Sequence, residues 1–138
     1  MGAVKIVFDP SGADAETVHR HLTLYNIGAT GVSTYYPVNL FLKSDRGETL
    51  GGLLGRVWGG WLHISILWID ESQRGKDWGT RLMDEAEAYG RERGCHSASL
   101  DTHSFQARGF YEKRGYEVFG VLDDYPEGHQ KFFLKKKL

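Results

Sequence analysis

The stretch that decides the fold runs from residue 62 to residue 94 and reads LHISILWID, ESQRGKDWG and TRLMDEAEAYGRERG. Its first part ends in a run that is apolar on both alternating faces, which is typical of a central strand covered on both sides. Its last part carries Trp78, Leu82, Ala86 and Tyr89 at the spacing of one helical face. A glycine-bearing turn from strand to helix suits an anion, because the first N–H groups of a helix are unpaired and its dipole is positive there. The stretch therefore predicts a strand, an anion-binding turn and a helix.

Asp77 leaves two interpretations of this turn open. Aspartate before a helix commonly caps it, which predicts a self-capped helix without a ligand. Alternatively the carboxylate points outward and the N–H groups stay available, with Arg74 and Lys76 offsetting its charge.

The other elements follow from hydrophobic periodicity and from turn residues. On the helix after the turn, Arg81, Asp84, Glu85, Glu87 and Arg91 are expected outside the apolar stripe. The expected strands are residues 4–8, 38–43, 49–58, 61–69, 97–102, 116–122 and 130–136, and the expected helices are residues 13–27, 78–93 and 106–114.

The composition bounds the class of protein. A chain of 138 residues, 41% hydrophobic and 25% charged, predicts one folded domain over residues 1–138. With 17 basic and 18 acidic residues, the net charge of -1 predicts neither nucleic-acid nor membrane binding. One cysteine, Cys95, and no cluster of metal-ligand spacing predict no disulfide and no metal. With no signal peptide or membrane span evident, we expect a cytoplasmic protein.

Two stretches resemble the GNAT superfamily of N-acetyltransferases. They are ILWIDESQRGKDWGTRLMDEAE at residues 66–87 and SFQARGFYEKRGYEVFGVL at residues 104–122. The resemblance implies an α/β fold with a mixed, mostly antiparallel seven-strand sheet, helices on both faces and central strands splayed to admit acetyl-coenzyme A. It also implies direct acetyl transfer to a primary amine of a small molecule or peptide in a ternary complex, and a homodimer. A non-catalytic coenzyme A sensor is the alternative.

The resemblance also implies the cofactor contacts. The pyrophosphate loop of the family falls on Arg74, Asp77 and Gly79, and Asp77 replaces its first glycine. A bulge in the preceding strand is implied as well, with an ordinary buried strand as the alternative. The implied cofactor-binding residues are Leu67, Trp68, Ile69, Arg74, Gly75, Lys76, Asp77, Trp78, Gly79, Thr80 and Ser104.

Two proton-transfer groups complete the expected site. An alkyl ammonium has a pKa of about 10.4, so only about one molecule in a few thousand is neutral at pH 7 and a base is needed. His63, expected on the face shared with Trp61, Ser65 and Leu67, falls where related enzymes place a glutamate base, and a hydrogen-bonded core histidine is the alternative. Glu71 and His103 are weaker candidates. Tyr111 matches the family tyrosine that protonates the coenzyme A thiolate, with a packing tyrosine as the alternative.

The acceptor is expected beside residues 29–36 and 123–127. The second segment, Asp123-Asp124-Tyr125-Pro126-Glu127, would attract a cationic amine by charge and by cation–π contact. A solvated turn is the alternative.

Overall fold

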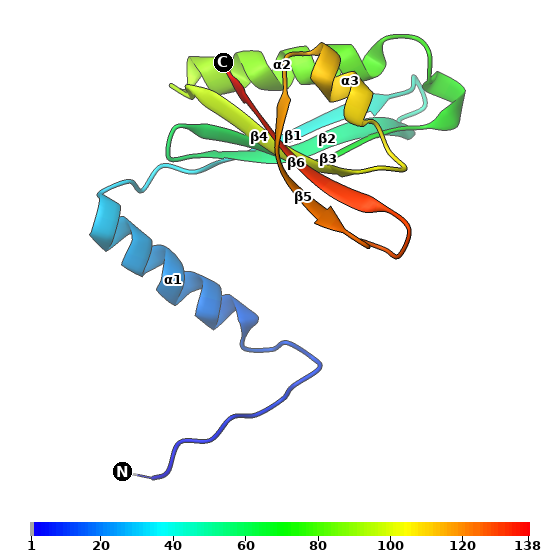
Figure 1. Cartoon of the computed structure of the whole chain (residues 1–138). Helices are drawn as coiled ribbons and strands as arrows, with labels where there is room; N and C mark the ends of the chain where they lie inside the picture. Colours follow the sequence, from blue (N-terminus) through cyan, green and yellow to red (C-terminus); the bar gives the residue numbers. More distant parts are fainter. Residues whose placement is uncertain (1) are drawn as a thin grey trace. The chain divides into compact units, whose positions relative to one another are not determined.

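The computed structural model describes residues 2–138, and it divides the chain into two compact units, Met1–Thr34 and Tyr35–Leu138 (Figure 1). The prediction of a single domain over residues 1–138 is not tested by this division and stays a prediction.

The first unit contains the helix α1, Ala15–Thr30, close to the expected position. It ends at Gly31, whose φ of 71° suits glycine and whose N–H donates to the carbonyl of Ile27 at 2.7 Å. The expected strand over residues 4–8 is wrong. A strand needs a hydrogen-bonded neighbour, and among residues 2–138 this segment has none, so the side chains of Val4, Ile6 and Phe8 are exposed.

The second unit is built on one sheet of six strands rather than the seven expected. Its order is β1-β2-β3-β4-β6-β5, and only β3 and β4 pair in parallel. The fold class is confirmed as a mixed, mostly antiparallel α/β sheet. The strands are β1 (Tyr36–Lys43), β2 (Thr49–Trp58), β3 (Trp61–Ile69), β4 (Ser97–His103), β5 (Glu117–Asp123) and β6 (Gln130–Lys137).

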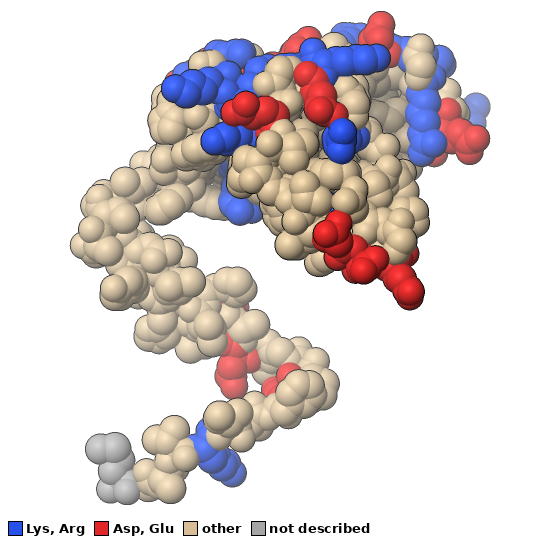
Figure 2. Space-filling view, in the orientation of Figure 1, with Lys and Arg blue, Asp and Glu red and all other residues tan. Residues whose placement is uncertain are grey.

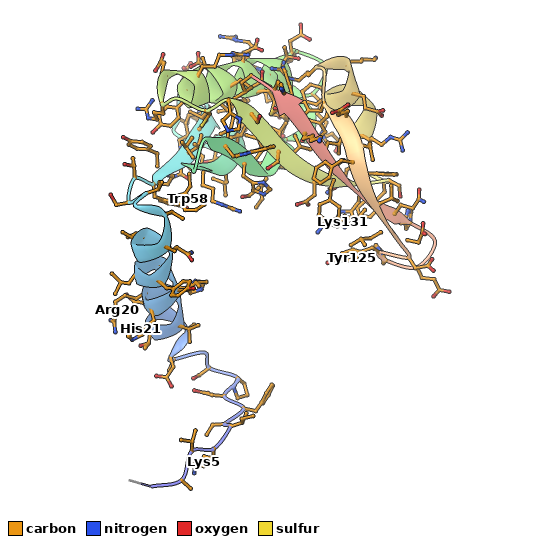
Figure 3. All side chains as sticks on the ribbon, turned by 60° about the vertical axis from the view of Figure 1, so that its left-hand side comes forward. Lys5, Arg20, His21, Trp58, Tyr125 and Lys131 are labelled. Atoms are coloured by element: carbon orange, nitrogen blue, oxygen red, sulfur yellow. The ribbon has the colours of Figure 1, made fainter. Side chains whose placement is uncertain are left out.

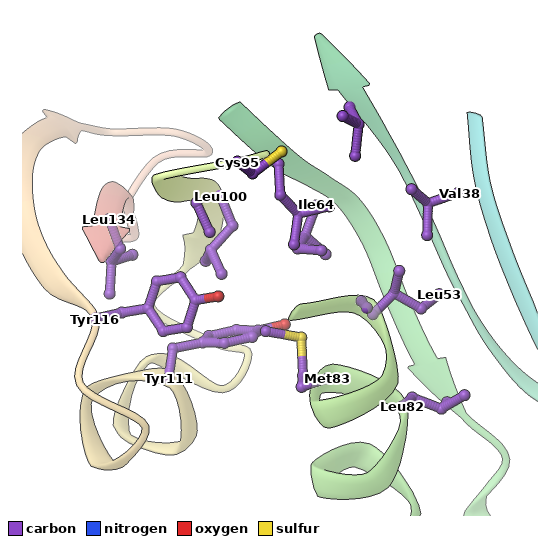
Figure 4. Close-up of a cluster of buried hydrophobic side chains, with 14 of the residues drawn as sticks. Val38, Leu53, Ile64, Leu82, Met83, Cys95, Leu100, Tyr111, Tyr116 and Leu134 are labelled. Atoms are coloured by element: carbon purple, nitrogen blue, oxygen red, sulfur yellow. The ribbon is translucent and has the colours of Figure 1, made fainter. Parts of the chain in front are cut away.

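Two helices of the second unit cover the same face of its sheet, α2 (Trp78–Glu92) and α3 (Arg108–Lys113) (Figure 1). Their apolar side chains meet the inward residues of the strands in one core, drawn in Figure 4. Met83 of α2 and Tyr111 of α3 lie in it with Leu53, Ile64 and Leu134 of the sheet. The core therefore fixes α3 against α2. The covering of the other face stays a prediction.

Glu87 lies inside this unit rather than on the expected outer side of α2, with only 3% of its surface exposed. Its carboxylate accepts a hydrogen bond from the Tyr116 hydroxyl at 2.8 Å and another from Lys136 Nζ at 2.9 Å. Arg114 contributes a third contact at 3.2 Å. These partners follow α3 or stand on β6, so helical periodicity alone could not reveal them. The carboxylate can be buried because these partners from outside α2, together with Arg91 at 3.9 Å, satisfy it.

Candidate active site

The strand β3 carries a bulge and separates from β4. In the pairing of β2 with β3, Leu54 stands opposite Ile66 and Gly55 opposite Ile64, so Ser65 is an extra residue. A Cβ on Gly55 would lie 2.4 Å from the His63 carbonyl oxygen, so only glycine fits beside the bulge. Pairing of β3 with β4 ends at Ile64 and Leu100, although both strands continue. The expected bulge and splayed strands are confirmed.

The bulge corrects one expectation about faces. Before Ser65, Leu62 and Ile64 face the core, and after it Leu67 and Ile69 pack against the same core. Leu67 therefore does not share a face with His63, because one extra residue reverses the alternation of a strand.

The opened end of β3 lines a pocket of about 550 Å³. Three predicted cofactor residues, Leu67, Trp68 and Ile69, line it, and so does Tyr111. The guanidinium Nε of Arg74 donates to the Ile69 carbonyl at 3.1 Å, which ties the loop to the end of the strand. The remaining lining residues are Arg74, Gly79, Phe105, Gln106, Ala107 and Phe110.

A second pocket of about 260 Å³ continues from the first over the N-terminus of α2. The two share Ile69, Arg74, Gly79 and Phe110. Gly79 faces the Phe110 ring, 3.5 Å from where a Cβ would stand. Because the first N–H groups of α2 have no intrahelical acceptors, this end of the groove suits a diphosphate. The predicted loop residues found here are Arg74, Gly75, Asp77, Trp78, Gly79 and Thr80, whereas Lys76 is exposed and outside the lining.

Asp77 does not cap α2. Its backbone is left-handed, with φ 65° and ψ 16°, a conformation that aspartate tolerates better than most residues. The exposed side chain accepts no capping hydrogen bond. The self-capped interpretation of the turn is therefore wrong, and the main-chain donors at the start of α2 stay available.

His63 lies half-buried on β3, across from Arg56 on one side and Ser99 on the other. Its Nδ1 is 2.9 Å from the Ser99 hydroxyl, so its hydrogen bond goes to a side chain rather than to the backbone. Burial, followed by the positive charge of Arg56, holds the pKa of His63 below its ordinary value, although Asp101 opposes this. The ring is therefore neutral at neutral pH, which is the form that accepts a proton. It is not among the lining residues of either pocket.

Tyr111 of α3 is buried but lines the larger pocket. Its ring packs edge-on against Phe110 and Tyr116, at 5.1 Å and 6.1 Å between centroids. Figure 4 shows it beside Tyr116. Burial, and then the negative charge of Asp101, raises the pKa of its phenol. The hydroxyl therefore keeps its proton at neutral pH and can donate it.

The hydroxyl of Ser104 makes its hydrogen bonds outside the pocket. Its hydroxyl accepts from the Gln130 N–H at 3.0 Å and lies 3.4 Å from His129 Nδ1, so it ties the end of β4 to β6. Phe105, Gln106 and Ala107 line the pocket in its place. These three residues lie inside the second motif, but the resemblance assigned the contact to Ser104 and not to them. The cofactor contact of Ser104 stays a prediction.

The weaker base candidates, Glu71 and His103, line neither pocket. Glu71 is exposed in a short 3-10 turn, Glu71–Gln73. His103 ends β4, with its Nδ1 3.2 Å from the Gln106 side chain.

Acidic side chains gather at the turn between β5 and β6 (Figure 2), where Asp123, Asp124 and Glu127 are exposed. Within residues 2–138, no group of histidine, cysteine and acidic residues could hold a metal, and no helix is long and apolar enough to cross a membrane.

Comparison with known proteins places this geometry in a family. The model of the acetyltransferase (GNAT) family matches residues 13–116. Blasticidin-S acetyltransferase of Streptomyces morookaense is 44% identical over 95 residues, which cover 68% of this chain and 70% of that protein. An acetyltransferase of Agrobacterium fabrum is 32% identical over 96% of this chain and 97% of its own length. The crystal structure of an acetyltransferase from Bacillus cereus matches with a TM-score of 0.84 and 34% identity, covering 97% of this chain and 98% of that one.

The sequence match spans the bulged strand, the loop, α2 and α3, and the solved relative repeats their arrangement. The chain belongs to the acetyltransferase (GNAT) family.

Proposed function

We propose that this chain transfers an acetyl group from acetyl-coenzyme A to a primary amine by direct attack within a ternary complex. The observation that carries the proposal is one continuous groove, which runs from the N–H groups of α2, past the opened end of β3, to Tyr111. Its two ends match the two parts of the cofactor, a diphosphate and a thioester. Family membership supports acyl transfer in general, and the rest is our proposal.

The residues of the groove fit coenzyme A in stated roles. The N–H groups of Trp78, Gly79 and Thr80 would hold the diphosphate, with Arg74 beside them. The backbone of Leu67, Trp68 and Ile69, left unpaired by β4, would bind the pantetheine arm and place a donor toward the developing oxyanion. When bound, acetyl-coenzyme A supplies an acetyl group on a good leaving thiolate.

The two titratable groups would move the protons. Neutral His63 takes the proton of the incoming ammonium, directly or through water, and Tyr111 gives a proton to the departing sulfur. Cys95 is not proposed as a nucleophile, because it is buried in the core and burial raises the pKa of its thiol.

Thiol release tests the proposal directly. The protein is mixed with acetyl-coenzyme A and a panel of amines that includes blasticidin S, small alkyl amines and short peptides, and free thiol is followed by its colour reaction. Blasticidin S is included because the name of one relative states it as a substrate. We expect amine-dependent thiol release. Coenzyme A binding without thiol release on any amine would favour the sensor alternative. The negative charge of Asp77 at the N-terminus of α2 gives that alternative some support. The cytoplasmic location and the homodimer stay predictions.

Replacing Asp77 by glycine is expected to strengthen coenzyme A binding by about threefold to tenfold. The change removes a negative charge from the phosphate end, and glycine adopts the left-handed backbone without strain. Calorimetry with coenzyme A measures the effect. Asp45→Gly, in the turn between β1 and β2 and outside both pockets, makes the same charge change and should leave affinity unaltered. Equal affinities for wild type and Asp77→Gly would mean that the carboxylate is not near the phosphates.

His63→Gln should lower kcat by about tenfold, below the roughly 100-fold or more that is usual for a general base, because water can partly replace it. The wild-type rate should fall only as pH drops through the lowered pKa of His63, beneath the ordinary 6.5, since the neutral ring is the active form. The variant should lose this acid limb when both are measured with the same amine. His96→Gln is the matched control, because His96 makes a similar bond to Ser97 at 2.8 Å. An unaltered pH profile in His63→Gln would remove His63 from the mechanism.

A further inference from the structure

The ammonium of Lys131 on β6 sits in a small box of three side chains. Its Nζ lies 3.7 Å from Asp101 Oδ1, 4.8 Å from the centre of the Tyr125 ring and 5.5 Å from that of Phe133. Figure 3 shows Lys131 and Tyr125 beside each other near the turn of β5 and β6. One carboxylate combined with aromatic faces is a chemistry that binds organic cations. We refer to Asp101, Tyr125 and Phe133 as the cation box.

The cation box lies beside the opening between β3 and β4. Asp101 is the first residue of β4 after the last pair, Ile64 and Leu100, and it stands opposite Phe133 on β6. Its negative charge acts to raise the pKa of both His63 and Tyr111.

Aromatic rings connect the cation box to the proposed thioester pocket. Phe105 lines that pocket and stacks on His103 with 5.1 Å between centroids, and His103 lies 5.5 Å from the Tyr125 ring. A molecule that reaches into the pocket could therefore contact the box with its other end.

Lys131 is held loosely. The 3.7 Å separation from Asp101 is beyond hydrogen-bond length, and neither side chain makes a hydrogen bond within residues 2–138. The two side chains are 19% and 32% exposed. By contrast, Lys136 donates to the buried Glu87 at 2.9 Å. The box thus holds its present cation by charge and by cation–π contact but without a hydrogen bond, and such partly exposed pairs contribute little stability.

The chemistry of the box also limits what it can bind. A carboxylate stabilises the protonated form of a nearby amine, so an amine seated against Asp101 would keep its proton and could not attack a thioester. The box therefore suits a positive group other than the nucleophile.

We infer that the acceptor carries a second positive group, an ammonium or guanidinium, beside the amine that is acetylated. This group binds Asp101, Tyr125 and Phe133 in place of the Lys131 ammonium. The inference rests on the proposed function and adds the substrate class: amines with two cationic centres.

Steady-state kinetics with the diamines putrescine and cadaverine, compared with butylamine and pentylamine, tests the inference. We expect the KM of the diamines to be about fivefold lower or more, consistent with one half-exposed ion pair with cation–π contact. Asp101→Asn should abolish that difference. Lys131→Met, which empties the box but keeps a long side chain, should lower the KM of the diamines about threefold and leave the monoamines unchanged.

Lys135→Met is the matched control. Lys135 stands on the same strand, 5.6 Å from the centre of the Phe119 ring and without an ion pair among the described residues, so its loss should not alter either KM. Coenzyme A affinity should be equal in all four proteins, which shows that each is folded. Turnover of diamines and monoamines with equal KM, or an Asp101→Asn variant that keeps the preference, would overturn the inference and leave acetyl transfer standing. Absence of thiol release with every amine would defeat the proposed function, and the inference with it.

Discussion

Tyr111→Phe should lower kcat by about 100-fold, which is the usual size of a lost general acid, and leave coenzyme A affinity unchanged. Tyr111 lines the groove near the proposed sulfur position, and its ring packs in the core, so phenylalanine keeps the packing and removes only the proposed proton donor. Stopped-flow and steady-state rates with a saturating amine measure the effect. Because burial raises the pKa of Tyr111 above its ordinary 10.0, no alkaline loss of wild-type activity from this group is expected below that pH.

The matched control is Tyr116→Phe. It removes a hydroxyl from the neighbouring ring of the same core, 6.1 Å away, but that hydroxyl donates to Glu87 and not into the groove. We expect it to reduce stability and to retain kcat below the unfolding temperature. Full turnover by Tyr111→Phe would show that the tyrosine only packs.

Glu87→Gln should lower the free energy of unfolding by about 3 kcal/mol, because it leaves Lys136 without its carboxylate and Arg114 with only Asp84, at 2.8 Å. Arg114 and Lys136 are only 13% and 18% exposed, and both contact Glu87. Urea denaturation followed by tryptophan fluorescence measures the loss. Glu85→Gln, on the exposed side of α2, should change stability by less than about 0.5 kcal/mol.

The same carboxylate makes stability depend on pH. Burial opposes the ionisation of Glu87, but hydrogen bonds from Lys136 and Tyr116 and the charge of Arg114 outweigh it, so its pKa in the folded protein is below the ordinary 4.5. A lowered pKa contributes stability that is fully present above pH 4.5 and is lost as pH falls through the folded value. Glu87→Gln should lack this acid-dependent part. A variant with the wild-type pH dependence would place its origin elsewhere.

Turn residues and hydrophobic periodicity were sufficient to predict most helices and strands of the second unit. The expected strands 49–58 and 61–69 agree with β2 and β3 because Gly59 and Gly60 leave no other position for the turn between them. The two motifs likewise placed α2 and α3, and with them the loop residues and Tyr111. Such elements depend on neighbours within a few residues, which a sequence displays directly.

Features that depend on distant partners were not predictable in this way. Glu87 is buried because three groups from outside its helix converge on it, and a helical pattern records only the helix. The hydroxyl of Ser104 binds the Gln130 N–H, which comes from another strand. Residues 4–8 have the composition of a strand, but composition does not provide a neighbour to pair with. For Asp77 the sequence left two interpretations open, and the structure contradicts only the helix cap, because the residue adopts a left-handed backbone and makes no capping hydrogen bond.

Ser65, the extra residue of the bulge in β3, is needed for the groove between β3 and β4 but not for the core of the sheet. If the strand passed from Ile64 directly to Ile66, inward and outward positions would alternate without interruption as far as Ile69, and the same side chains would still reach the core. The sheet gains nothing from this residue. A single inserted amino acid thus accounts for the irregularity at the centre of an otherwise regular scaffold, and a related sequence that lacks it could keep the architecture while losing the groove.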